Sequence, residues 1–153
     1  MKTMKDADIR PALRSVATLV NPTGTFLYGP LSQGSFRSVY DALPIIQLIP
    51  LSGNINLSTD AKNVNVELRF LGHAEADEDG NKLYESLQTS PEQQEVILAD
   101  MEELMNTYFS ALMKVAGVQI GQVQYQELRR QFAACITGYR ATFTWQTLRP
   151  QVC

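Results

Sequence analysis

The chain has 153 residues, of which 44% are hydrophobic and 19% are charged. This composition is typical of one globular domain and excludes a wholly disordered chain. Sixteen acidic residues against thirteen basic ones give a net charge of −3, which disfavours a nucleic-acid-binding protein, because such proteins are usually basic. No apolar run reaches the roughly 18 residues of a membrane span, and the first residues, MKTMKDAD, lack the apolar stretch of a secretory signal. We therefore expect one domain over residues 1–153, folded in the cytosol, with an ordered core over 6–148 and tails at 1–5 and 149–153.

The first part of the chain predicts one helix and several short elements. Apolar residues recur at helical spacing over residues 6–20, and the β-branched and aromatic segment 25–28 predicts a short strand. Residues 35–42 predict a short helix or turn. The almost wholly apolar segment 43–51 predicts a central strand that is covered on both faces. Residues 52–54, Ser-Gly-Asn, then predict a turn.

The clearest strand signal lies in residues 64–71, where apolar and polar side chains alternate strictly. The alternation predicts one buried face and one face that meets water or a partner. The apolar set is Val64, Val66, Leu68 and Phe70, and the polar set is Asn65, Glu67 and Arg69.

The second half predicts the longest helix, over about 91–116, which starts at the capping sequence Ser-Pro-Glu-Gln and stops at Gly117. Residues 118–125 predict a strand and 128–134 a short helical or irregular link. Residues 138–148 predict a second alternating strand, with Tyr139, Ala141, Phe143 and Trp145 on one face and Arg140, Thr142, Thr144 and Gln146 on the other. Together these elements predict an α+β fold, with a mixed, mostly antiparallel sheet packed against the long helix and the N-terminal helix.

The segment 72–89 is acidic and rich in turn residues. Its sequence Glu75-x-Asp77-x-Asp79-Gly80 resembles the start of a calcium-binding loop, in which alternate carboxylates converge on the ion. The resemblance then fails, because the twelfth position is Ser86 instead of a bidentate glutamate, and the segment follows a strand instead of a helix. We interpret the segment as a solvated hairpin or a mobile loop.

The residues that carry catalytic or metal chemistry are few and scattered. His73 is the one histidine, Cys135 lies in an apolar stretch where a thiol is usually inert, and Cys153 is the last residue. Glycine-rich phosphate-binding loops and the nucleophile motif Gly-x-Ser-x-Gly do not occur. We therefore predict no enzyme activity, no metal and no cofactor. A small metal- or ligand-binding domain that uses the acidic loop and His73 is the alternative from a different functional class.

Several segments together resemble the tail terminator (tail-completion) proteins of tailed bacteriophages and prophages. The resemblance covers most of residues 8–148 and rests on patterns of residue class. It is carried by Phe-Leu-Tyr-Gly at 26–29, Leu-Pro-Ile-Ile-Gln-Leu-Ile-Pro at 43–50, the strand at 64–71, the helix at 91–116, and Gly-Tyr-Arg-Ala-Thr-Phe-Thr-Trp at 138–145. It implies an α+β domain that assembles into a hexameric ring, caps the tail tube at its head-proximal end and joins the tube to the neck. The family has no catalytic residues to transfer.

The implied partners are further copies of the chain, the tail tube protein and the neck or head–tail connector proteins, with no membrane and no sequence-specific nucleic acid. The implied location is the tail–neck junction of the virion, after assembly in the cytoplasm of the host bacterium. Interface candidates come from the acidic loop, the basic C-terminal third and the polar strand face: Asp77, Asp79, Arg129, Arg130, Arg140, Thr142 and Thr144. Another head–tail connector, neck or tube subunit is the alternative within this class.

Overall fold

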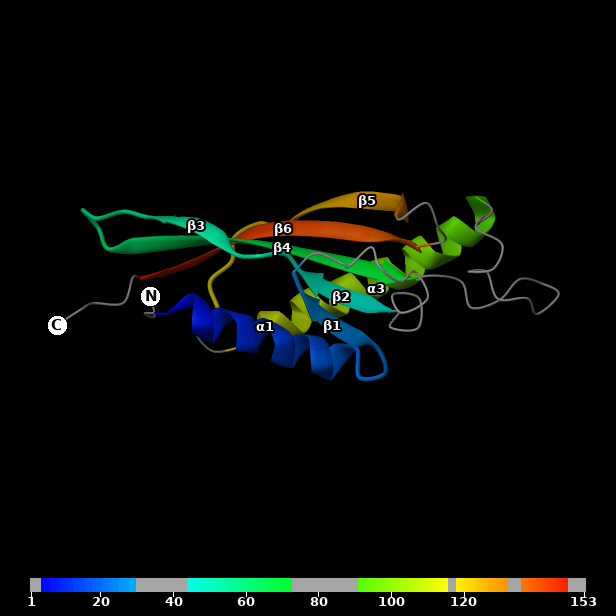
Figure 1. Cartoon of the computed structure of the whole chain (residues 1–153), viewed down its shortest axis with the longest axis horizontal. Coiled ribbons are helices and arrows are strands. Elements are labelled where there is room, and N and C mark those ends of the chain that lie inside the picture. Colours follow the sequence, from blue (N-terminus) through cyan, green and yellow to red (C-terminus); the bar gives the residue numbers. More distant parts are fainter. Residues whose placement is uncertain (1–3, 30–43, 73–90, 116–117, 132–135, 149–153) are drawn as a thin grey trace.

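The computed structural model describes residues 4–29, 44–72, 91–115, 118–131 and 136–148. In this part of the chain, six strands form one sheet, and two helices pack on one face of it (Figure 1). In chain order the elements are α1 (Asp6–Val20), β1 (Thr25–Tyr28), β2 (Ile45–Leu48), β3 (Ser52–Ile55), β4 (Ala61–Gly72), α3 (Pro91–Leu112), β5 (Gln124–Gln131) and β6 (Ile136–Leu148).

The sheet is mixed and mostly antiparallel, which confirms the α+β prediction. Its strand order is β1-β2-β4-β6-β5, and β3 pairs with the first part of β4, beside the path of the other strands. Among the described strands, only the pair β1–β2 is parallel, and the four other pairs are antiparallel. The long central strands β4 and β6 pair along residues 61–72 and 137–148.

The core lies between the sheet and the helices, where the predicted apolar faces meet. The register of β4 and β6 places Val64 opposite Trp145, Val66 opposite Phe143 and Phe70 opposite Tyr139. The helices contribute residues at helical spacing, so each helix buries one stripe against the sheet. These buried helix residues are Ile9, Leu13, Val16 and Ala17 of α1 and Ile97, Leu98, Met101, Met105, Tyr108 and Leu112 of α3.

Tyr108 of α3 contacts both α1 and the sheet. Its hydroxyl donates a buried hydrogen bond to the carbonyl oxygen of Leu13 at 3.0 Å. Its ring makes edge-on contacts with Phe70 and Phe109, with centroid distances of 5.5 Å in each case. Burial raises the pKa of the Tyr108 hydroxyl, so this group stays protonated, and a hydrogen-bond donor, at a pH where an exposed tyrosine ionises.

Gly138 allows β4 and β6 to approach closely where β6 enters the core. A Cβ atom at this position would lie 1.7 Å from the carbonyl oxygen of Phe70 and 2.8 Å from its carbonyl carbon. Since both are backbone atoms of the neighbouring strand, a side chain would push the two strands apart. The glycine before Tyr139 is therefore a requirement of strand pairing.

Most predicted elements are confirmed, some with different ends. The helix 6–20 and the strand 25–28 have the predicted bounds. The apolar segment forms β2, which is shorter than predicted but lies between two strands and is buried at all four positions. The long helix ends at Leu112 instead of about 116, because the N–H groups of Lys114 and Val115 bond three residues back, in turn geometry.

Three predictions in polar segments are wrong. Residues 52–54 belong to β3 instead of a turn, and Gly53 fits there because a Cβ would lie 2.1 Å from the carbonyl oxygen of Asn63. The strand predicted at 118–125 is strand only from Gln124, where β5 begins; before it, Ile120 forms an isolated bridge with Trp145. The predicted link at 128–134 is strand as far as Gln131. In each case strand pairing decides the outcome over local propensity.

Several predictions lie outside the described residues. They are the short helix or turn at 35–42, the acidic loop with His73, Asp77 and Asp79, the stop at Gly117, and both cysteines. At the N-terminus, Met4 is buried, and its N–H bonds to the carbonyl oxygen of Leu148. No helix in the described part of the chain is long and apolar enough to cross a membrane.

Candidate interaction surface on the open sheet face

The helices cover one face of the sheet, and the opposite face carries an ordered set of polar side chains. We call this second surface the open face. The register pairs Asn65 with Thr144, Glu67 with Thr142 and Arg69 with Arg140. On β5, Gln124 and Gln126 extend the same surface, because they pair with Thr142 and Arg140. All these side chains are partly or fully exposed.

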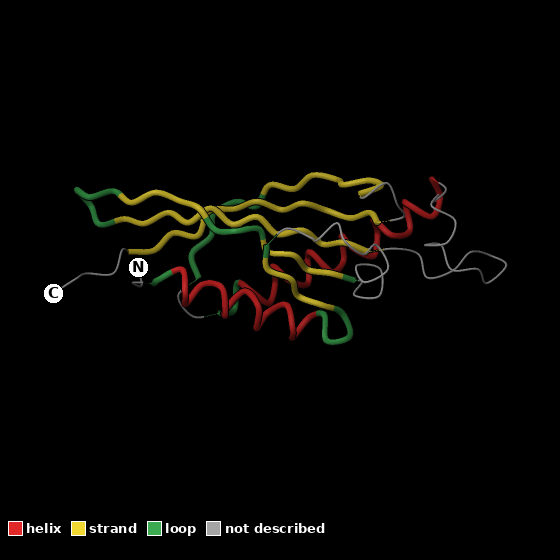
Figure 2. Tube along the Cα trace, in the orientation of Figure 1, coloured by secondary structure: helices red, strands yellow, loops and turns green. Residues whose placement is uncertain are grey.

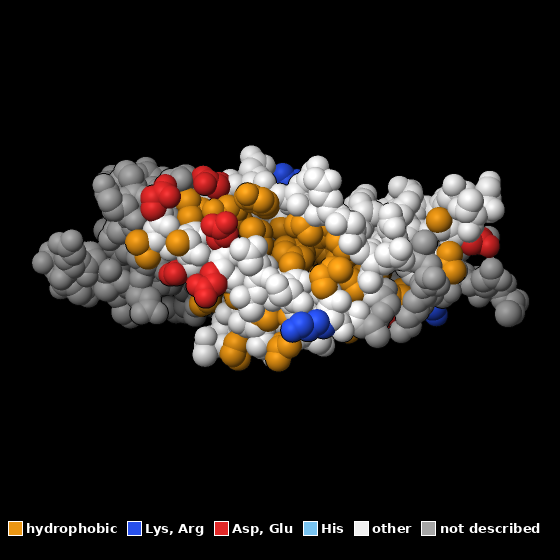
Figure 3. All heavy atoms as spheres, turned by 180° about the vertical axis from the view of Figure 1, so that it is seen from behind, with side chains coloured by type: hydrophobic (Ala, Val, Ile, Leu, Met, Phe, Trp, Pro, Cys, Tyr) orange, Lys and Arg blue, Asp and Glu red, His pale blue; other side chains and the backbone are white. Residues whose placement is uncertain are grey.

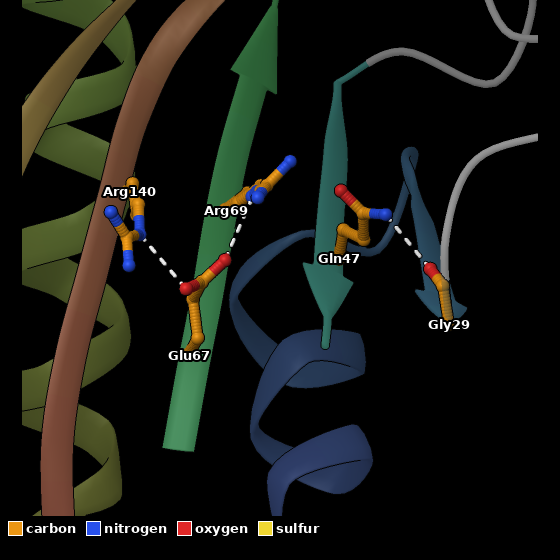
Figure 4. A network of polar contacts seen from close by, with 5 residues as sticks. All are labelled: Gly29, Gln47, Glu67, Arg69 and Arg140. Carbon is orange, nitrogen blue, oxygen red and sulfur yellow. Dashed lines mark hydrogen bonds and ion pairs between the residues drawn. The ribbon is translucent and has the colours of Figure 1, made fainter. Parts of the chain in front are cut away.

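Glu67 lies between two arginines at the centre of the open face (Figure 4). Its Oε1 atom is 2.8 Å from Nε of Arg140, and its Oε2 atom is 3.0 Å from Nε of Arg69. The Glu67 side chain is 18% exposed, and those of Arg69 and Arg140 are 33% and 41% exposed. One carboxylate shared by two guanidinium groups leaves a local charge of about +1 on a protein whose net charge is negative.

A polar groove of about 580 Å³ crosses the open face. Glu67 and Arg140 contribute to its floor, and the segment before β5 contributes Gly121 and Gln122. A small-molecule site is usually enclosed and mainly apolar, whereas this groove is open to solvent and lined mostly by amides, hydroxyls and charged groups. The groove is therefore better suited to contact with a protein surface.

Gln47 of β2 is buried beside the open face and paired in register with Arg69. Its Nε2 atom donates to the carbonyl oxygen of Gly29 at 2.8 Å, as Figure 4 shows. Gly29 has a φ of 94°, a conformation that favours glycine. The side-chain amide therefore fixes the end of β1 against β2 next to the charged group.

The structure brings together three of the predicted interface residues: Arg140, Thr142 and Thr144 all lie on the open face. Arg129 and Arg130 lie in β5 near the register shift between Leu128 and Gln131, but their side chains are outside what the structure describes. Asp77 and Asp79 also lie outside it. The predicted interface residues did not include Glu67 and Arg69, which lie at the centre of the open face, although the alternation had placed both on the polar face of the strand.

Titratable chemistry is sparse in the described residues. They hold no group of three histidine, cysteine, aspartate or glutamate side chains that could bind a metal ion. Desolvation raises the pKa of Tyr139, and the nearby charges of Glu102 and Glu127 raise it further. Tyr139 and Tyr108 lie on the helix side of the sheet, away from the polar groove.

No model of a known protein family matches the sequence, and no curated protein aligns with it at a significant level.

Proposed function

We propose that the protein is a virion structural protein, a tail terminator that forms a ring at the tail–neck junction. The proposal combines the resemblance of the sequence to tail terminator proteins with the surface described above. The observation that carries it is the open face, where Glu67 is held by Arg69 and Arg140 beside a broad polar groove. Such a surface is suited to a charged protein partner, because charged and polar groups give an interface its specificity.

A projecting part of the sheet also favours the interpretation that this protein is a subunit of an assembly. We call it the arm: β3 with the paired residues 61–65 of β4 and 144–148 of β6. Figure 2 shows the arm extending past the start of α1, with the turn between β3 and β4 at its end. Ile55 and Leu57, near this turn, are 52% and 73% exposed. We infer that a partner covers these two apolar side chains in the assembly, since burying apolar surface favours association.

The test is negative-stain electron microscopy of the purified protein together with its mass by light scattering. We expect closed rings, with the mass of six copies of the 17.1 kDa chain for the hexamer. Rings that bind one end of isolated tail tubes and stop further addition of tube subunits support a terminator. A monomer that stays monomeric with tail tubes present contradicts the proposal.

The other outcomes identify the alternatives. An open, elongating stack indicates a tube subunit, and binding to portal complexes indicates a head–tail connector. A rise in melting temperature with a divalent ion, lost in Asp77→Ala/Asp79→Ala, indicates a metal-binding domain, because a ligand that binds only the native state stabilises it.

A further inference from the structure

The outer surface of α3 carries a group of acidic side chains. Met101, Met105 and Tyr108 of this helix face the core, so the opposite side of the helix points away from the sheet. Two exposed glutamates, Glu102 and Glu103, lie toward that side and line the same shallow hollow, and we call them the acidic helix surface. Figure 3 shows acidic side chains gathered toward the end of the molecule at which α3 begins.

The acidic helix surface and the open face have opposite charges and point in opposite directions. The two carboxylates of Glu102 and Glu103 lie on the helix surface, whereas on the open face the two arginines Arg69 and Arg140 outnumber the single carboxylate of Glu67. The sheet and the body of α3 lie between the open face and the acidic helix surface, so the two surfaces of one molecule cannot contact each other. They can meet only between two molecules.

We propose that the acidic helix surface of one copy docks on the open face of the next copy. This inference rests on the proposed function, since it names the contact between successive subunits of the ring. A contact between two different surfaces of identical chains is heterologous, and it closes into a ring when the rotation between copies allows closure.

The arginines have the donors that this contact needs. Arg140 and Arg69 each donate to Glu67 through the Nε atom, at 2.8 Å and 3.0 Å respectively. Each guanidinium group has further N–H donors on its two Nη atoms. Arginine binds carboxylates in a bidentate way, so the pair can receive acidic side chains from a neighbour. Glu67 fixes both guanidinium groups before a partner binds, which lowers the loss of side-chain entropy on binding.

The shapes of the two surfaces also permit close approach. The residues around Glu102 and Glu103 are small or short, and they line a shallow hollow of about 500 Å³: Ala99, Asn106, Thr107 and Ser110. The open face offers its own groove, with Arg140 on the floor. Because the side chains around Glu102 and Glu103 are short, these two carboxylates can reach into the groove of the open face.

The experiment uses two charge-inverted variants of the full chain. The first is Glu67→Arg/Arg69→Glu/Arg140→Glu, which keeps one central charge between two opposite charges but inverts the sign of the open face. The second is Glu102→Lys/Glu103→Lys, which makes the helix surface basic. Lys114→Glu is the control, because it changes the net charge as much as the first variant, at an exposed position outside both surfaces. Circular dichroism and thermal melting verify that each variant is folded.

Sedimentation velocity then measures assembly of each variant alone and of an equimolar mixture. We expect each inverted variant alone to associate at least about ten-fold more weakly than the unchanged chain, since like charges then face each other. The mixture should assemble again, because each reversed surface meets a reversed partner and each original surface an original one. Assembly of the unchanged chain should weaken as salt rises, and Lys114→Glu should assemble normally.

Each remaining outcome overturns the docking. If both inverted variants form rings as the unchanged chain does, another surface makes the contact, while the ring and its role stand. If the variants are folded monomers and the mixture stays monomeric, these two surfaces are not partners. If the unchanged chain is monomeric at high concentration and low salt, docking between copies is refuted, and the terminator role depends on the separate measurement with tail tubes.

Discussion

Removing the Tyr108 hydroxyl tests how α1 is held on the rest of the fold. Tyr108→Phe keeps the ring and its edge contacts with Phe70 and Phe109, and it removes only the 3.0 Å hydrogen bond to the Leu13 carbonyl oxygen. That carbonyl also belongs to the hydrogen-bond ladder of α1, so it keeps a donor in the variant. The net contribution of one such bond is about 1 kcal/mol.

We therefore expect Tyr108→Phe to lower the free energy of unfolding by about 1 kcal/mol, or the melting temperature by about 2–4 °C for a domain of this size. Tyr108→Ala also removes the buried ring and should cost about 3–5 kcal/mol. Urea unfolding at neutral pH measures both values. Tyr125→Phe is the control, because Tyr125 is 63% exposed and its hydroxyl should contribute little.

The pH dependence of the free energy of unfolding, compared between the unchanged protein and Tyr108→Phe, gives a second check. Burial raises the pKa of Tyr108 in the folded state, whereas an unfolded tyrosine ionises near about pH 10. Above that pH the unfolded chain binds fewer protons than the folded chain, so the tyrosine protein loses stability as pH rises. The phenylalanine variant lacks this loss, so the gap between the two proteins should narrow above about pH 10. An equal stability of both proteins at neutral pH, or a gap that widens at high pH, refutes this account of Tyr108.

Three further changes test the sheet and its open face. Gly138→Ala should lower the free energy of unfolding in urea by about 3 kcal/mol, because the added Cβ meets the Phe70 backbone. Gly121→Ala is the control and should change it little, because the space around Gly121 is open. Equal effects of the two substitutions contradict the argument that Gly138 allows β4 and β6 to approach closely. Glu67→Gln should lower stability by about 1 kcal/mol at low salt and by less at high salt; a loss that does not depend on salt excludes the two ion pairs as its cause. Lys62→Met breaks the 2.7 Å ion pair with Asp6, and melting should show a loss below about 1 kcal/mol; a larger loss means that this pair anchors the start of α1.

The sequence predicts the elements whose side chains follow one periodicity over a long stretch. The residues 64–71 and 138–148 alternate strictly, and both form long strands with the predicted faces. β3 and β5 were missed because their stability comes from pairing: β3 begins with Ser-Gly-Asn, and β5 is mainly polar. Local sequence carries little information about a strand that is held by the backbone of its neighbour.

The candidate surface illustrates the same limit at the level of single residues. The alternation correctly placed Arg140, Thr142 and Thr144 on the polar face of their strand. The ion pair between Arg140 and Glu67, however, joins residues 73 positions apart. It depends on the register between β4 and β6, and a shift of one residue would move every side chain to the opposite face. Periodicity shows which face of the sheet a residue lies on, but only the register between strands shows which residues are its neighbours on that face.

The pairing of β4 with β6 also has a consequence for the order in which the chain folds. The pair joins residues 61–72 to residues 137–148, and all of α3 lies between them in sequence. Contacts between such distant segments form slowly, because a long loop must close first. During synthesis β2 and β3 can pair with one edge of β4 while its other edge waits for the last strand of the described sheet. A nascent chain that ends before β6 therefore exposes one unpaired edge of the central strand β4, and an exposed strand edge favours aggregation.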